Sequence, residues 1–148
     1  MPDKETLERA QEDKREGKSP STQAGEFVKE EMDHIREGKH GARSTKQAIA
    51  IGLSKARRAG VELPPPRKGT ASAETRKQAG RDAAKGKAGA QRPSAKRSRA
   101  TSKALRREGH SAASPAALAR QARSAAKKRT RADRSRAARR AVRTRKGR

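Results

Sequence analysis

The sequence predicts a mostly α-helical protein that is largely disordered: a small helical hairpin, at about 22–37 and 45–59, followed by a basic tail with only transient helices. Large apolar side chains are scarce, since Val, Ile, Leu, Phe and Met after Met1 number 13 in 148 residues, and nine of them lie between Phe27 and Leu63. The formal net charge is +25. Low hydrophobicity with high net charge is typical of chains that bury too little surface to offset the entropy of ordering.

The charge is concentrated in the second half of the chain. Residues 1–63 hold 13 Lys and Arg against 12 Asp and Glu, whereas residues 64–148 hold 28 against 4. Three consecutive prolines, Pro64–Pro66, favour a stiff extended segment and stop a helix. We therefore expect four parts: a charged N-terminal arm or marginal helix (1–19), the helical hairpin (20–63), a Pro-rich joint (64–69) and a basic disordered or conditionally helical tail (70–148).

The N-terminal arm has the end signals of a helix but little to bury. Pro2 and Asp3 suit a helix start, and Gly17 suits its end. Apart from Met1, its apolar side chains are Leu7 and Ala10. A short helix without a face to bury is marginal in isolation.

The hairpin is predicted from apolar spacing and from end signals. In its first helix, apolar residues from Ala24 to Ile35 fall on one face, and Gly38 follows as a natural stop. In its second, Ser44 and Gln47 have the spacing of a capping box. Gly60 suits the left-handed position that closes a helix, with Val61 placed for a Schellman motif.

The apolar side chains of the hairpin have two interpretations. They form a tiny core of their own in about 40 residues, near the lower limit for unaided folding, or the hairpin completes its core against a partner or a second copy. Ile51 favours the second interpretation, because on a helix it points about 160° from the midpoint of Ile49 and Leu53. The expected core or protein-contact residues are Phe27, Val28, Met32, Ile35, Ile49, Ile51, Leu53 and Val61.

The tail has the composition of a phosphate-binding polycation. Each neutralised phosphate releases condensed counterions, and the Arg fork matches phosphate oxygens. The chain has no Trp or Tyr and one Phe, so it lacks a platform for stacking unpaired bases, which favours duplex DNA over RNA. The expected nucleic-acid-binding residues are Arg97, Arg99, Lys103, Arg106, Arg107, Arg120, Arg123, Lys127, Lys128, Arg129, Arg131, Arg134, Arg136, Arg139, Arg140, Arg143, Arg145, Lys146 and Arg148.

Two resemblances add to this interpretation. The stretch "GKHGARSTKQAIAIGLSKARRAGV" resembles a family of small bacterial proteins of unknown function, over roughly residues 25–63, with Gly52 where that pattern has Ala. The resemblance implies a bacterial setting and no known activity. The tail is similar, by composition only, to the basic tails of linker histones and of bacterial histone H1-like proteins.

Candidates for catalysis or metal binding are few. His34 and Glu37 share a helical face, but His40 lies beyond Gly38, so we interpret the group as a solvated helix end and expect no metal and no cofactor. Ser44 has no base nearby, and capping explains it. There is no Cys, and no run approaches the length of a membrane span. The sequence gives no sign of an enzyme.

The leading hypothesis is therefore a non-enzymatic, sequence-nonspecific DNA-binding protein, nucleoid-associated and histone-like, in the bacterial cytoplasm. Its tail binds the phosphate backbone, and its head serves protein contact or self-association. Two alternatives stay open: an RNA- or ribosome-associated basic protein, and an adaptor whose head binds a protein partner.

Overall fold

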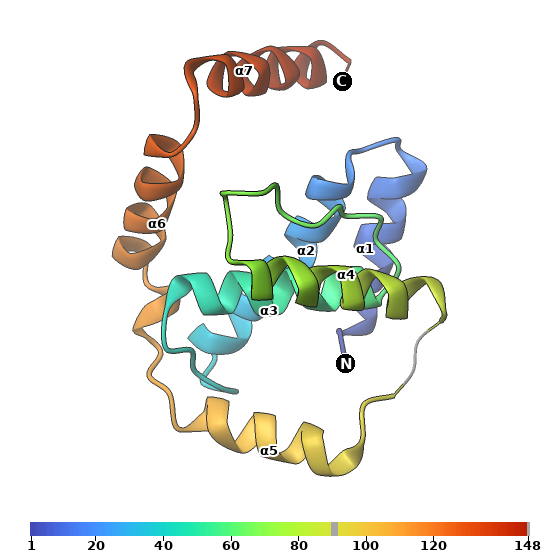
Figure 1. Ribbon diagram of the computed structural model, residues 1–148, viewed down its shortest axis with the longest axis vertical. Helices are drawn as coiled ribbons and strands as arrows, with labels where there is room; N and C mark the ends of the chain where they lie inside the picture. The colour runs from blue at the N-terminus through green and yellow to red at the C-terminus, as the bar shows by residue number, and fades with distance from the viewer. Residues whose placement is uncertain (90–91, 148) are drawn as a thin grey trace. The chain divides into compact units, whose positions relative to one another are not determined.

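The computed structural model describes residues 1–89 and 92–147, and these form seven α-helices and one short 3-10 helix (Figure 1). They fall into two compact units, Met1–Ser114 and Pro115–Arg148. The first contains α1 (Lys4–Arg15), α2 (Pro20–Arg36), α3 (Thr45–Arg58), α4 (Ala73–Lys87), α5 (Ala95–Arg106) and the 3-10 helix η1 (Ser111–Ala113). The second contains α6 (Pro115–Lys127) and α7 (Arg131–Lys146).

The prediction of a largely disordered chain is wrong, and so is that of a tail with only transient helices. The prediction counted large apolar side chains, whereas most of the buried apolar residues are alanines. Alanine loses no side-chain entropy on ordering and lets two helix backbones approach closely, so it contributes to a core at little cost. The buried alanines are Ala10, Ala24, Ala42, Ala48, Ala56, Ala79, Ala112 and Ala113.

Helices α2 and α3 pack against each other at a close crossing. A Cβ atom on Gly52 of α3 would lie 2.7 Å from Val28 Cα and 2.9 Å from Val28 N in α2. Glycine at this position therefore permits an approach that alanine does not. Phe27 and Ile35 of α2 are fully buried.

The predicted closure of α3 at Gly60 and Val61 is confirmed, whereas the predicted capping box at its start forms only in part. Ser44 Oγ accepts a hydrogen bond from Gln47 N–H at 3.2 Å, although the Gln47 side chain accepts from Arg43 N–H rather than from Ser44. Gly60 has φ +93°, and Val61 N–H donates to Ala56 O at 3.0 Å, as a Schellman motif requires.

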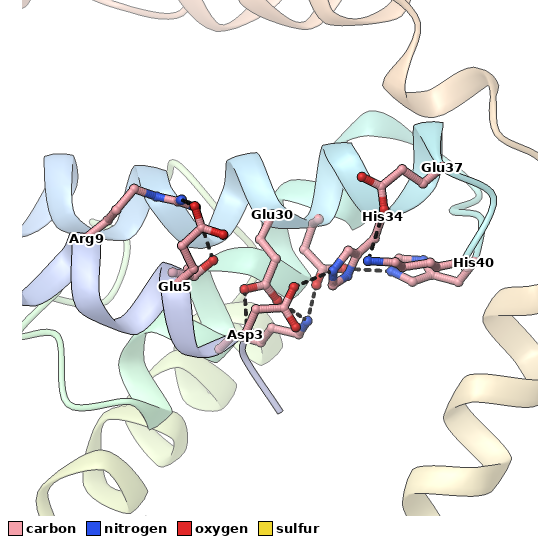
Figure 2. Close-up of polar contacts among 11 residues, drawn as sticks. Asp3, Glu5, Arg9, Glu30, His34, Glu37 and His40 are labelled. Carbon is pink, nitrogen blue, oxygen red and sulfur yellow. Dashed lines mark hydrogen bonds and ion pairs between the residues drawn. The ribbon is translucent and has the colours of Figure 1, made fainter.

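Helix α1 packs against α2 rather than standing free as an arm. Ala10 joins a core cluster with Ala24, Phe27 and Ala56, and Leu7 packs against it. Polar contacts add to this packing: the guanidinium of Arg9, a residue labelled in Figure 2, contacts the Glu26 carboxylate at 2.7 Å.

Helix α4 packs on the face of α3 that carries Ile51. Ser54 and Arg58, one and two turns after Ile51, both donate to the buried Asp82 carboxylate of α4, at 2.7 and 2.8 Å. A Cβ atom on Gly86 would lie 2.0 Å from the carbonyl oxygen of Arg57, so α4 approaches the end of α3 closely. The second apolar face of α3 is thus met by a helix of the same chain.

The segment after the hairpin is tied back to α3 by a buried arginine. Arg57 Nε donates to Leu63 O at 3.3 Å, and its Nη2 donates to Pro64 O at 3.2 Å. Burial lowers the pKa of Arg57. These bonds fix the direction of the chain as it leaves α3 for the Pro-rich segment and α4.

The chain after α5 returns to the α2–α3 turn through backbone hydrogen bonds. Gly41 N–H donates to Leu105 O at 2.9 Å, and Ala42 N–H donates to Gly109 O at 3.1 Å. Thr45 Oγ1 also donates to the carbonyl oxygen of Ala112 at 2.7 Å. The compact unit therefore reaches Ser114, well beyond the Pro-rich segment.

Helices α6 and α7 form despite their like charges. α6 begins at Pro115, whose fixed φ suits the first helical position. Thr130 caps α7 by accepting from Asp133 N–H at 3.1 Å, and Asp133 places a negative charge in the first turn. Like-charge pairs cost only about 0.2–0.5 kcal/mol each, which Ala and Arg propensity offsets.

Candidate nucleic-acid interface

The predicted basic residues all lie on exposed helix surfaces or in the turns that follow them, except Arg148, which lies outside the described residues. In α5 and the residue that follows it they are Arg97, Arg99, Lys103, Arg106 and Arg107. In α6 and the turn after it they are Arg120, Arg123, Lys127, Lys128 and Arg129. In α7 they are Arg131, Arg134, Arg136, Arg139, Arg140, Arg143, Arg145 and Lys146.

Helix α5 presents a shallow groove that combines hydroxyls and cations. Its lining residues recur at helical spacing, so they form one face of the helix. Hydroxyl groups and guanidinium or ammonium groups are the side-chain donors that contact phosphate oxygens in nucleic-acid complexes. The groove is lined by Ser98, Arg99, Ser102, Lys103, Arg106 and Arg107.

Helices α6 and α7 differ in how their cations are arranged. In α6, Arg120, Arg123 and Lys127 recur three and four residues apart and so share one face. In α7 the eight cations spread around most of the helix, and the remaining side carries Asp133, Ala137 and Ala141. A helix of the α7 kind can meet phosphates from several directions, whereas α6 offers a single strip.

These cations are almost free of neutralising partners. Within residues 92–147 there are 20 Lys and Arg against two acidic residues, Glu108 and Asp133. In the described parts of α5, α6 and α7 the one ion pair joins Asp133 and Arg136 at 2.5 Å. Hydrogen bonds from Thr130 and Arg136 lower the pKa of Asp133. Each of these helices thus presents a strongly positive surface with few neutralising groups.

The predicted core or protein-contact residues of the head all belong to the first unit and are buried or half-buried there. Phe27, Met32 and Ile35 are buried. The others are half-buried and belong to α2, α3 and the turn after α3; they are Val28, Ile49, Ile51, Leu53 and Val61.

Apart from the basic helices, a cluster of polar residues that the sequence did not predict lies where the start of α1 meets α2 and α3 (Figure 2). Glu30 and Glu31 of α2 are both buried, and both contact the Lys55 ammonium of α3, Glu30 at 3.1 Å. Asp3 N–H also donates to Glu30 Oε2 at 3.0 Å. The sequence signal that could have indicated this cluster is the position of Glu31, four residues from both Phe27 and Ile35 on the apolar face of the helix, since carboxylates are rarely buried unless paired.

The ionisation of this cluster follows from its contacts. Burial opposes ionisation of Glu30, but hydrogen bonds from Asp3 N–H, Thr6 and Lys55 outweigh it and lower the pKa of Glu30. Burial likewise opposes the charge on Lys55, but the contacts with Glu31 and Glu30 outweigh it and raise the pKa of Lys55. Glu30 and Lys55 are therefore both charged near neutral pH.

Two histidines complete the cluster. His34 Nε2 lies 3.0 Å from Asp3 Oδ2, and His40 Nε2 lies 3.2 Å from Glu31 Oε2. The two rings meet edge to face, with centroids 5.9 Å apart (Figure 2). Their side chains are only 13% and 15% exposed, so the group is not the solvated helix end that the sequence predicted. Glu37, the carboxylate considered with them, instead contacts Lys39 at 3.0 Å on the surface.

Comparison with known proteins identifies one family. Residues 14–68 match the sequence pattern of a family of unknown function (DUF6496), which confirms the resemblance found around the α2–α3 turn. Neither the comparison with curated proteins nor that with solved structures gave a match. The matched segment ends before α4, so the family indicates nothing about the basic helices. In the part of the chain that the structure describes, no helix is long and apolar enough to cross a membrane.

Proposed function

We propose that this protein binds duplex nucleic acid without sequence preference, through the cationic surfaces of α5, α6 and α7. The observation that supports the proposal is the exposure of nearly all their Lys and Arg side chains, with a single ion pair among the described residues of these helices. Leaving so many cations unpaired raises the energy of the free protein, and phosphates relieve this cost. Nucleoid association in a bacterium is the setting that fits this activity.

Preformed helices change how this binding works. A disordered tail loses conformational entropy when it folds on its target, whereas α5, α6 and α7 are already helical. Arg side chains on fixed faces can track the backbone or enter a narrow minor groove. The first unit, whose largest apolar side chains Phe27 and Ile35 are fully buried, then serves as the folded body that carries the α5 groove.

The test is competitive binding of the full chain to unrelated DNA duplexes and to a structured RNA over a series of salt concentrations. We expect equal affinities for the duplexes, no preference for RNA, and a steep loss of affinity with salt. An RNA preference that persists at high salt would instead support the ribosome-associated alternative.

Two variants that each lose four positive charges test whether α7 forms part of the nucleic-acid-binding surface. Neutralising Arg139, Arg140, Arg143 and Arg145 of α7 to Gln removes four cations. The control neutralises four exposed cations of the first unit: Lys14, Arg15, Lys29 and Lys46. If each α7 cation contacts one phosphate, the α7 variant lowers the slope of log affinity against log salt by about 3 to 4, and the control leaves it nearly unchanged. Equal effects from both variants would contradict the assignment.

A further inference from the structure

We propose that Glu31, His34 and His40 form a binding site for a divalent transition-metal ion of the zinc type. The three residues converge from α2 and from the turn after it, with one ligand atom of each within 4.8 Å of the others. Two imidazole nitrogens and a carboxylate oxygen are a ligand set that zinc uses where one position stays open to water.

The orientation of His40 is the strongest evidence for the site. His40 Nδ1 lies 3.0 Å from the carbonyl oxygen of Gly41. A carbonyl oxygen only accepts hydrogen bonds, so Nδ1 carries a proton, and whenever the ring is neutral its Nε2 presents a lone pair. A ring N–H held by a backbone carbonyl is the usual support of a metal-binding histidine.

That lone pair faces another acceptor. His40 Nε2 lies 3.2 Å from Glu31 Oε2, and a carboxylate oxygen has only lone pairs to offer. Two acceptors at this distance repel unless a proton or a metal ion lies between them. Ligands at about 2.0–2.2 Å from a tetrahedral zinc ion lie about 3.3–3.6 Å apart, so the observed separation needs to widen only slightly to hold two ligands of one ion.

Neighbouring residues orient the other two ligands, Glu31 and His34. Glu31 is 1% exposed, and the Lys55 ammonium contacts its other oxygen, Oε1, which leaves Oε2 directed to His40. His34 is held by the Asp3 carboxylate at 3.0 Å, an outer contact that raises the basicity of a metal-binding imidazole.

Charge in the cluster also fits a divalent ion. Asp3, Glu30 and Glu31 carry three negative charges and Lys55 one positive charge, so the cluster has a net charge of −2 when both histidines are neutral. One divalent ion balances this charge. Protonation of both imidazoles is the competing way to do so.

The experiment is a titration of the chelator-treated full-length protein with Zn²⁺ by calorimetry and with Co²⁺ by visible absorption. We expect one equivalent of either ion to bind, with the intense absorption of tetrahedral Co²⁺ and a rise in Tm. Glu31→Gln, His34→Ala and His40→Ala should each weaken Zn²⁺ binding by about 100-fold or more, because loss of a ligand exceeds loss of an outer contact. His110→Ala, which removes an exposed histidine outside the cluster, should bind like the unmodified protein.

Circular dichroism of each variant without metal separates loss of a ligand from loss of the fold, and Glu31→Gln keeps the side-chain volume. If the folded, unmodified protein takes up no stoichiometric Zn²⁺, or if Zn²⁺ binds equally to the three ligand variants, the proposal is wrong. The cluster is then balanced by imidazolium ions.

Discussion

The crossing of α2 and α3 is open to a direct test at Gly52. An alanine Cβ there would lie 2.7 Å from Val28 Cα, 2.9 Å from its N and 3.0 Å from its Cγ2, and two of these atoms are backbone. In an exposed helix, Gly→Ala raises the free energy of unfolding by about 0.5–1 kcal/mol. Forcing atoms into a packed interface costs about 1–3 kcal/mol. We therefore expect Gly52→Ala to lower the free energy of unfolding by about 1–2 kcal/mol.

Gly25 of α2 provides the matched control, because a Cβ there would meet nothing within 4 Å. Gly25→Ala should raise the free energy of unfolding by about 0.5–1 kcal/mol, so the two variants should differ by the overpacking cost, about 1–3 kcal/mol. The measurement is urea denaturation of the full chain followed by far-ultraviolet circular dichroism. If Gly52→Ala is as stable as Gly25→Ala, then α2 and α3 do not cross closely at this position and the account of their packing is wrong.

Two further predictions concern buried charges. Asp82→Ala removes the acceptor of Ser54 and Arg58, so it should lower the free energy of unfolding, measured by urea denaturation, by about 2–3 kcal/mol. The control is Asp33→Ala, which removes a half-exposed ion pair with Arg36 and should change the free energy of unfolding by less than about 0.5 kcal/mol. Equal effects of the two variants would show that the packing of α4 does not depend on Asp82. Stability should also depend on pH at both extremes. The lowered pKa of Glu30 contributes stability that is present above its ordinary value of 4.5 and is lost as the pH falls through the folded-state pKa. The raised pKa of Lys55 contributes stability that is present below 10.5 and is lost as the pH rises through the folded-state pKa. Thermal melts from pH 2 to 11 check both limbs, and Glu30→Gln should flatten the acid limb; an unchanged limb would mean that Glu30 does not contribute to it.

The sequence by itself determined the features that depend on neighbours along the chain. The start at Ser44 and the closure at Gly60 and Val61 are short-range hydrogen-bonding patterns, so residue types at fixed offsets suffice to predict them. The concentration of positive charge after the Pro-rich segment is likewise a property of the sequence alone. It predicts a polycation in any fold, because Lys and Arg in such excess cannot find enough carboxylates to pair with.

The tertiary structure decided which small and charged residues become interior. Nothing local distinguishes Gly52 or Gly86 from Gly25 or Gly80, yet the first two lie against another backbone and the second two lie in open space. In the sequence, Asp82 is one of four acidic residues in a basic tail. Only the packing of α4 against α3 makes it a buried hydrogen-bond acceptor.

Contacts between residues far apart in the chain also decided the candidate metal site and the structure of the basic helices. Glu31 and Glu37 each lie three residues from His34, and the sequence offered no way to choose between them; the turn that returns His40 toward the buried side of α2 selects Glu31. The sequence also did not predict that the basic segment forms stable helices. Counting large apolar residues overlooks alanine packing and backbone hydrogen bonds such as that from Gly41 N–H to Leu105 O. Such contacts join residues far apart in the chain, so only the folded structure reveals them.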